Sequence, residues 1–190
     1  MRSCDDGRMP FLIVLGIIAL IVMYVVMQYN GLVRVRNRIE NGWAQIDVQL
    51  KRRHDLIPNL VETVKGYAAH ERATLEAVIT ARNSAMSAHG EAGKAQAENA
   101  LSGTLKSLFA LGEAYPDLKA NQNFLQLQEE LTGTEDKIAY SRQYYNDEVR
   151  AYNTKIQSFP SNVLAKQFKF AQREYFQTDD AERGPVSVKF

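Results

Sequence analysis

The sequence predicts an all-α protein: a single N-terminal transmembrane helix, then an elongated antiparallel bundle of about four helices, then an extended C-terminal tail. An apolar run from Phe11 to Met27 is long enough to insert in a bilayer. After it, apolar residues recur at alternating steps of three and four, which is typical of a heptad seam. No segment before the C-terminal tail shows the strict alternation or the β-branched enrichment of a strand.

The apolar run is expected to be a retained anchor (residues 11–29) behind a short flank (residues 1–10). A cleavable signal would end in small residues, whereas this run is followed by bulky or polar ones. Tyr24 and Tyr29 would lie near one membrane interface. Arg34, Arg36 and Arg38 follow the run, and this thin positive bias favours the cytosolic side for the rest of the chain.

The composition argues for one soluble domain behind the anchor. The chain has 190 residues, and its 23 Lys and Arg nearly balance 22 Asp and Glu. A net charge of +1 gives no electrostatic basis for nucleic-acid binding. The single cysteine, Cys4, excludes an intramolecular disulfide and a cysteine metal cluster.

Few helix breakers interrupt the bundle, which we expect to span residues 30–176. The first helix should pass Pro58 with a kink, or break and restart there, and should end near Ala88 with Gly90 as terminator. A polar, alanine-rich stretch at residues 91–97 should lead into a second helix that ends near residue 111, and a third helix should run from about residue 117 to 159. Pro160 should begin a short fourth helix.

The part of the seam next to the membrane is expected to lack apolar partners within the chain. An unmatched apolar stripe usually marks an oligomer contact or a partner helix. The proposed assembly seam consists of Leu32, Ile39, Trp43, Ile46 and Leu50.

Charged residues interrupt the seams, and they are candidates for ion pairs that fix the register of the bundle. They are Arg53, Glu71, Glu135 and Arg142. Either they pair across the bundle, where a shifted alignment would leave a charge unpaired, or their long stems cover apolar surface with the charged ends in water. In the register interpretation, Arg53→Met or Glu135→Leu should hardly lower the melting temperature but should broaden the set of assembled species.

Two Tyr-Asn dipeptides, at residues 145–146 and 152–153, lie one heptad apart. We expect core tyrosines with satisfied hydroxyls rather than a ligand site. Asn59, after Pro58, is expected to satisfy backbone groups freed at the proline.

The tail, residues 177–190, ends in an alternating pattern with Val186, Val188 and Phe190 on one side. An extended apolar C-terminus suits capture by strand addition in a partner protein. The alternative is that the tail packs on its own bundle or on a neighbouring subunit.

No motif for catalysis or for cofactor binding is complete. His70-Glu71 begins like a zincin helix, but Thr74 stands where the second histidine is required. No nucleophile elbow and no phosphate-binding glycine loop is present. We therefore expect a protein that is not an enzyme, with no catalytic residues, no cofactor and no metal.

Motifs spread over nearly the whole chain resemble the LemA family of bacterial membrane proteins. They are Tyr29-Asn30-Gly31-Leu32-Val33, Trp43 with Gln45-Ile46-Asp47, Asp55 to Val61, Gly66-Tyr67-Ala68, His70-Glu71, Asn123-Phe124, Leu127-Gln128, Tyr145-Asn146, Tyr152-Asn153, Phe159-Pro160 and Pro185-Val186. The resemblance implies a helical bundle behind one membrane anchor and brings no established catalytic activity. Some members resemble lipoproteins with a cysteine before the Tyr-Asn pair, and Gln28 stands at that position here.

Two classes of function are consistent with these features. The first is a membrane-anchored scaffold of the bacterial cytoplasmic membrane that forms homo-oligomers, organises or recruits envelope proteins, and shapes the membrane in its stronger form. The second is an adaptor or sensory subunit that transmits a state across the bilayer to a partner such as a membrane protease. The expected partners are the lipid bilayer, further copies of the chain and an envelope protein bound through the tail.

Overall fold

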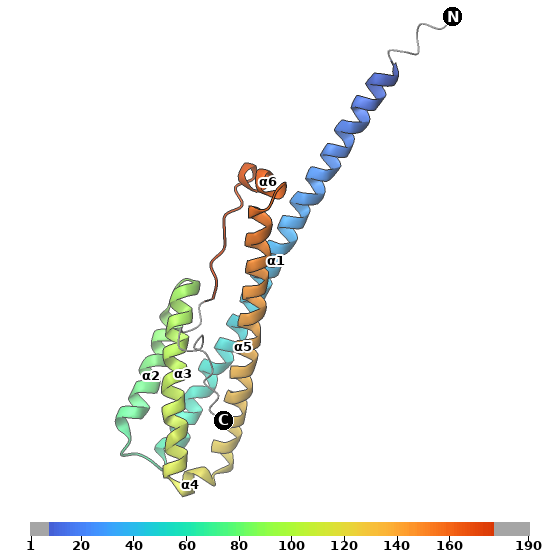
Figure 1. Ribbon diagram of the computed structural model, residues 1–190. Helices are drawn as coiled ribbons and strands as arrows, with labels where there is room; N and C mark the ends of the chain where they lie inside the picture. The colour runs from blue at the N-terminus through green and yellow to red at the C-terminus, as the bar shows by residue number, and fades with distance from the viewer. Residues whose placement is uncertain (1–7, 177–190) are drawn as a thin grey trace, which may run out of the picture. The chain divides into compact units, whose positions relative to one another are not determined.

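A computed structural model describes residues 8–176, and all of its regular elements in this range are helices (Figure 1). The prediction of an all-α fold is confirmed for this part of the chain. The six helices are α1 (Arg8–Lys65), α2 (Arg72–Ser87), α3 (Glu91–Ala114), α4 (Pro116–Lys119), α5 (Gln122–Gln157) and α6 (Ser161–Gln167).

Helix α1 is a single element of 58 residues that passes through Pro58 without a break. Its N-terminal part is long and apolar enough to cross a membrane, and the apolar window there is wholly unburied. A proline cannot donate to the carbonyl four residues earlier, so the carbonyl of His54 loses its helical partner. Arg82 on α2 replaces that partner, since its Nε donates to the His54 carbonyl at 2.7 Å. The expectation that Asn59 satisfies this group is therefore wrong.

The expected continuation of the first helix to Ala88 is also wrong. Helix α1 ends at Lys65, and α2 begins at Arg72 after a short turn. In this turn the Ala68 amide donates to the Val64 carbonyl at 2.8 Å, and Ala68 is buried. The reversal lets apolar residues of α2 join those of α1 in one core. The heptad pattern continues across the turn because both helices face that core.

The later boundaries also differ from the prediction. Helix α3 extends to Ala114, and α4 separates it from α5, which begins at Gln122 rather than near residue 117. Asn121 explains this start, because its Oδ1 accepts the backbone N–H of Phe124 at 3.0 Å, as an N-cap residue does. The expected left-handed terminator at Gly90 is wrong: α2 ends at Ser87 with Ala88 as its C-cap, and Gly90, with φ 74° and ψ 160°, is the N-cap of α3. The short helix after Pro160 is confirmed as α6.

The chain divides into two compact units. Of the described residues, 41–147 and 174–176 form the bundle unit, and 8–40 and 148–173 form the anchor unit. The expected segments 11–29, 30–176 and 177–190 remain predictions.

The bundle unit is built around an apolar core to which α1, α2, α3, α4 and α5 all contribute. These core residues are Ile57, Leu60, Val64, Ala68, Leu75, Val78, Ala85, Leu101, Leu105, Leu108, Leu118, Phe124 and Leu131.

The anchor unit buries fewer apolar side chains, drawn from α1, α5 and α6. They are Leu32, Ile39, Val149, Tyr152, Ile156 and Ala165.

Candidate interaction surfaces

The proposed assembly seam is not a free surface. Leu32 and Ile39 are buried in the anchor unit, and Ile46 and Leu50 are buried in the bundle unit. Trp43 is half-buried, with its ring 5.4 Å from that of Tyr145. The expectation that this stripe lacks partners within the chain is therefore wrong. The later helices supply those partners.

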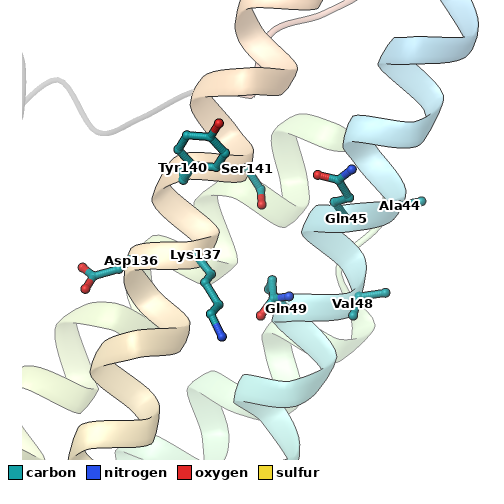
Figure 2. Close-up of a pocket in the computed structure, with 8 residues that line it drawn as sticks. All are labelled: Ala44, Gln45, Val48, Gln49, Asp136, Lys137, Tyr140 and Ser141. Atoms are coloured by element: carbon teal, nitrogen blue, oxygen red, sulfur yellow. The ribbon is translucent and has the colours of Figure 1, made fainter.

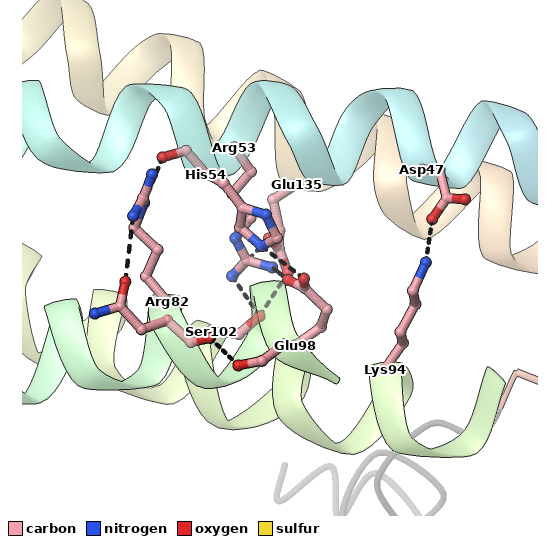
Figure 3. Close-up of polar contacts among 10 residues, drawn as sticks. Asp47, Arg53, His54, Arg82, Lys94, Glu98, Ser102 and Glu135 are labelled. Atoms are coloured by element: carbon pink, nitrogen blue, oxygen red, sulfur yellow. Dashed lines mark hydrogen bonds and ion pairs between the residues drawn. The ribbon is translucent and has the colours of Figure 1, made fainter. Parts of the chain in front are cut away.

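A buried ion network lies in the bundle unit and joins α1, α3 and α5 (Figure 3). Arg53 and Glu98 are each 1% exposed, and Arg53 Nη1 lies 3.3 Å from Glu98 Oε2. Arg53 Nη2 donates to Ser102 Oγ at 2.7 Å and lies 3.2 Å from Glu135 Oε2. The structure thus brings together two of the predicted register residues, Arg53 and Glu135.

His54 also belongs to this network, because it contacts the other carboxylate oxygen of Glu98. Its Nε2 lies 2.7 Å from Glu98 Oε1, and because an ionised carboxylate only accepts hydrogen bonds, Nε2 is the donor. His54 is buried. The sequence did not indicate that Glu98 is buried, because a glutamate in an alanine-rich, polar stretch is usually exposed on the surface.

The network holds charges that water would otherwise solvate. Removing one partner from a buried ion pair costs about 3–5 kcal/mol, whereas a whole pair contributes little net stability over an apolar replacement. We therefore expect these charges to favour one alignment of α1, α3 and α5 while adding little to the stability of the bundle unit. That role as register setter remains a prediction.

The other two predicted register residues have different partners. Glu71 accepts a hydrogen bond from the Tyr115 hydroxyl at 3.1 Å. This bond to Glu71, with smaller contributions from burial and from the Glu71 charge, raises the pKa of Tyr115 above its ordinary value of 10.0. Arg142 donates to Asn99 Oδ1 at 3.3 Å and lies over the ring of Phe176, 4.5 Å from its centroid.

Phe176 is the centre of a clamp in the bundle unit. Asn146 binds its backbone twice, since Nδ2 donates to the carbonyl at 3.0 Å and Oδ1 accepts the amide at 2.8 Å. The Tyr145 hydroxyl donates to the Glu174 carbonyl at 3.1 Å, and the Trp43 ring lies 5.8 Å from that of Phe176. Phe176 is buried as a result.

The second Tyr-Asn dipeptide repeats this motif in the anchor unit. Asn153 Nδ2 donates to the Arg173 carbonyl at 2.9 Å, and Oδ1 accepts the Arg173 amide at 3.0 Å. Tyr145 and Tyr152 are buried, as core tyrosines should be. Burial raises the pKa of Tyr152, and the nearby Arg173 and Arg36 oppose that rise. The heptad repeat of the dipeptide was the signal for these asparagine clamps, which sequence reasoning missed.

An open groove on the bundle unit lies between α1 and α5, with a volume of about 590 Å³ (Figure 2). Val48 on α1 and Tyr140 on α5 line it, and both side chains are exposed. Asp136 and Lys137 add one charge of each sign. The remaining lining residues are Ala44, Gln45, Gln49 and Ser141.

Within residues 8–176, no group of three or more His, Cys, Asp or Glu side chains could hold a metal ion. The proposed partner-binding residues Val186, Val188 and Phe190 lie outside the described residues. Residues 8–176 thus contain an apolar N-terminal helix long enough to span a membrane, a helical bundle and an open groove.

Such a chain falls in the class of helical proteins with one apolar N-terminal helix able to span a membrane. The model of the LemA family matches residues 42–190. The chain belongs to the LemA family.

Curated relatives agree over most of the chain. The chain is 28% identical to Protein LemA of Metamycoplasma hominis, over 94% of this chain and 83% of that protein. It is 24% identical to the magnetosome protein MamQ of Magnetospirillum gryphiswaldense and 26% identical to the magnetosome protein MamQ 2 of Paramagnetospirillum magneticum. Each of these two matches covers 97% of this chain and 78% of the relative.

Proposed function

We propose that this protein is a non-catalytic, membrane-anchored scaffold that oligomerises and so organises or recruits other proteins of the bacterial envelope. Its α1 helix supplies the membrane anchor and continues into the bundle unit, where the open groove lies. The buried seam cannot serve as the assembly surface without opening the bundle. We therefore place assembly at the groove between α1 and α5.

The observation that carries this proposal is the exposure of Val48 and Tyr140 on the two walls of one groove. Single exposed apolar residues are ordinary, but two large ones that face a common groove provide a contact that excludes water. Tyrosine is also enriched at the centres of protein interfaces.

A second copy of the chain is the occupant that suits this groove. An isologous contact requires a surface that complements itself. Asp136 and Lys137 are neighbours in the groove, so a two-fold axis can set the acid of one copy against the base of the other. The groove carries no excess of one sign that would repel its own copy.

The test is the mass of the full chain in nanodiscs and in detergent, measured by light scattering over a range of concentrations. We expect an oligomer for the wild type. Val48→Glu with Tyr140→Glu should weaken assembly about tenfold or more, which corresponds to about 1.4 kcal/mol. Met86→Glu with Leu125→Glu places the same charges on exposed apolar positions away from the groove and should leave assembly unchanged. A monomer at every concentration would remove the scaffold.

An adaptor or sensory subunit is the second candidate, and the continuity of α1 favours it. One helix runs from the anchor past Pro58 to Lys65, so a displacement at the membrane could reach the bundle unit without crossing a loop. A monomer that binds a membrane protease or another partner only with its anchor intact would support this function over the scaffold.

We further propose the cytoplasmic membrane as the location, the cytosolic side for the bundle unit, and an envelope partner for the tail. Alkaline phosphatase fused after Phe190 should be inactive on that side, and an active fusion would overturn the orientation. Deletion of residues 186–190 should abolish partner capture at unchanged melting temperature if the tail is a ligand. A lower melting temperature or weaker assembly would instead indicate docking on the bundle.

A further inference from the structure

The turn between α5 and α6, in the anchor unit, exposes large apolar side chains. Phe159 is 82% exposed and Val163 is 58% exposed, and Phe168 at the end of α6 is also exposed. Three such residues within ten positions are unusual in a segment where Ser161 and Ala165 are buried. Water is a poor environment for this group, so a covering surface is expected.

The turn contacts α1 just after the end of the apolar run. The Ser161 hydroxyl donates to Gln28 Oε1 at 3.3 Å, and Gln28 directly follows Met27, the last residue of the apolar run. The Tyr29 ring lies 4.9 Å from the Phe168 ring and 5.8 Å from the Phe170 ring. These contacts place the turn at the level of Gln28 and Tyr29 on α1.

The length of the apolar run indicates how deep in the bilayer Gln28 and Tyr29 lie. At about 1.5 Å per residue, Phe11 to Met27 covers about 26 Å, somewhat less than a hydrocarbon layer of about 30 Å. About three more residues are needed to reach the second interface, and these are Gln28, Tyr29 and Asn30. The turn that packs on Gln28 and Tyr29 therefore lies at the boundary between acyl chains and headgroups.

The charge of the same segment suits a lipid surface. Residues 149–173 contain no Asp or Glu, and they carry Arg150, Lys155, Lys166, Lys169 and Arg173. Lys166 and Lys169 are exposed on and just after α6, next to the exposed apolar side chains. Lysines beside aromatic side chains are typical of segments that lie at a membrane interface, where the lysines attract anionic headgroups.

We propose that the α5–α6 turn is a second membrane-contact site of this protein. Phe159 and Val163 insert at the acyl–headgroup boundary of the bilayer that α1 spans, and Lys166 and Lys169 bind the phosphates of anionic lipids. The anchor unit is thereby held at two points, so its rotation and tilt at the membrane are restricted. The inference rests on α1 spanning the bilayer and not on assembly, since a monomer would show it equally.

The test uses the full chain with Cys4→Ser and one new cysteine, labelled with an environment-sensitive fluorophore and reconstituted in vesicles. The label is placed at Val163→Cys, at Met86→Cys as the exposed control on the bundle unit away from the groove, or at Val22→Cys within the anchor. Lipids with a quencher near the headgroup should quench the Val163 label by about half and the Met86 label by about a tenth or less. The Val22 label, quenched by acyl-chain quenchers, identifies preparations in which α1 is inserted.

Two further variants test which side chains of the turn contact the lipid. Phe159→Asp should reduce quenching of the Val163 label and leave that of the Val22 label unchanged. Lys166→Gln with Lys169→Gln should remove the extra quenching that phosphatidylglycerol brings over pure phosphatidylcholine. A Val163 label no more quenched than the Met86 label, in preparations with α1 inserted, would overturn the proposal. A label that is shielded from water but not quenched by lipid would also overturn it, because a protein would then cover the turn.

Discussion

The bundle unit encloses an apolar core and a buried ion network, whereas the anchor unit buries a handful of apolar residues and leaves the turn that carries Phe159 exposed. Both units hold an extended segment of chain with the same device, an asparagine that bonds the amide and the carbonyl of one residue. The surroundings of that device differ. Around Phe176 the clamp has additional ring and guanidinium contacts, and around Arg173 it has an ion pair to Glu40 at 3.5 Å.

The difference teaches that one heptad-patterned chain can stabilise its parts in two ways. The bundle unit excludes water from its own core, so its stability is expected to reside in packing and in paired charges. The anchor unit, in our proposal, obtains part of its burial from lipid. The following predictions test this contrast, from the largest expected effect to the smallest.

The ion network should be the most sensitive feature of the bundle unit. Arg53→Met leaves Glu98 buried without its guanidinium, and we expect a loss of about 3–5 kcal/mol in the free energy of unfolding. The sequence alone suggested a small effect, whereas the burial of Arg53 predicts a large one. Chemical denaturation of the full chain in detergent measures the loss.

Two controls make this prediction specific. Glu135→Gln should cost less than about 1 kcal/mol, because the Glu135 side chain is 43% exposed and water replaces its pairing. Arg53→Met with Glu98→Leu should recover much of the stability lost in Arg53→Met alone. Equal losses for Arg53→Met and Glu135→Gln would contradict a buried network.

The bond of Arg82 to His54 should depend on Pro58. Arg82→Met leaves the His54 carbonyl without a partner, and we expect a loss of about 1–3 kcal/mol. In a Pro58→Ala background the residue at position 58 can donate to that carbonyl, so Arg82→Met should then cost much less. A double-mutant cycle on the free energy of unfolding measures the coupling, and additive losses would refute the compensation.

The two asparagine clamps allow a direct comparison of the units. Asn153→Ala and Asn146→Ala each remove two hydrogen bonds, and we expect each to loosen its segment by about 1–3 kcal/mol. Hydrogen exchange of the Arg173 and Phe176 amides reports the two sites separately. We expect faster exchange at Arg173 in Asn153→Ala than at Phe176 in Asn146→Ala, because ring contacts still hold Phe176. The reverse order would break the contrast between the units.

The smallest effect should be the titration of Tyr115. Its hydrogen bond to Glu71 raises the pKa of Tyr115 in the folded state above 10.0, so this bond stabilises the fold below pH 10.0. That contribution should disappear as the pH rises through the folded-state pKa. Glu71→Gln should lower the pKa of Tyr115 towards 10.0, as followed by ultraviolet difference spectroscopy with Tyr115→Phe identifying the signal. An unchanged pKa in Glu71→Gln would show that Glu71 is not the cause.

Much of the fold could be read from local patterns. The helices, the passage through Pro58, the end before Gly90 and the restart after Pro160 follow from hydrophobic periodicity and from the stereochemistry of proline and glycine. The turn at residues 66–71 could not be read in this way, because the heptad pattern continues across it. Periodicity reports which side of a helix faces a core, and two successive helices that face one core show the same period as a single long helix.

The candidate surfaces were less predictable. Arg53 and Glu135 were singled out as interruptions of a seam, whereas Glu98 and His54 sit among polar neighbours and gave no signal of burial. Val48 and Tyr140 lie off the seams, so they read as ordinary surface residues.

The amino-acid order therefore accounts for the membrane-spanning run, the helical class and the side of each helix that faces inward, because these depend on residues within a few turns of one another. The reversal after Lys65, the partners of Arg53 and the double bonds of Asn146 and Asn153 depend on segments far apart in the chain. Their burial and pairing arise only when those segments meet, since desolvation penalises every charge or amide that lacks a partner.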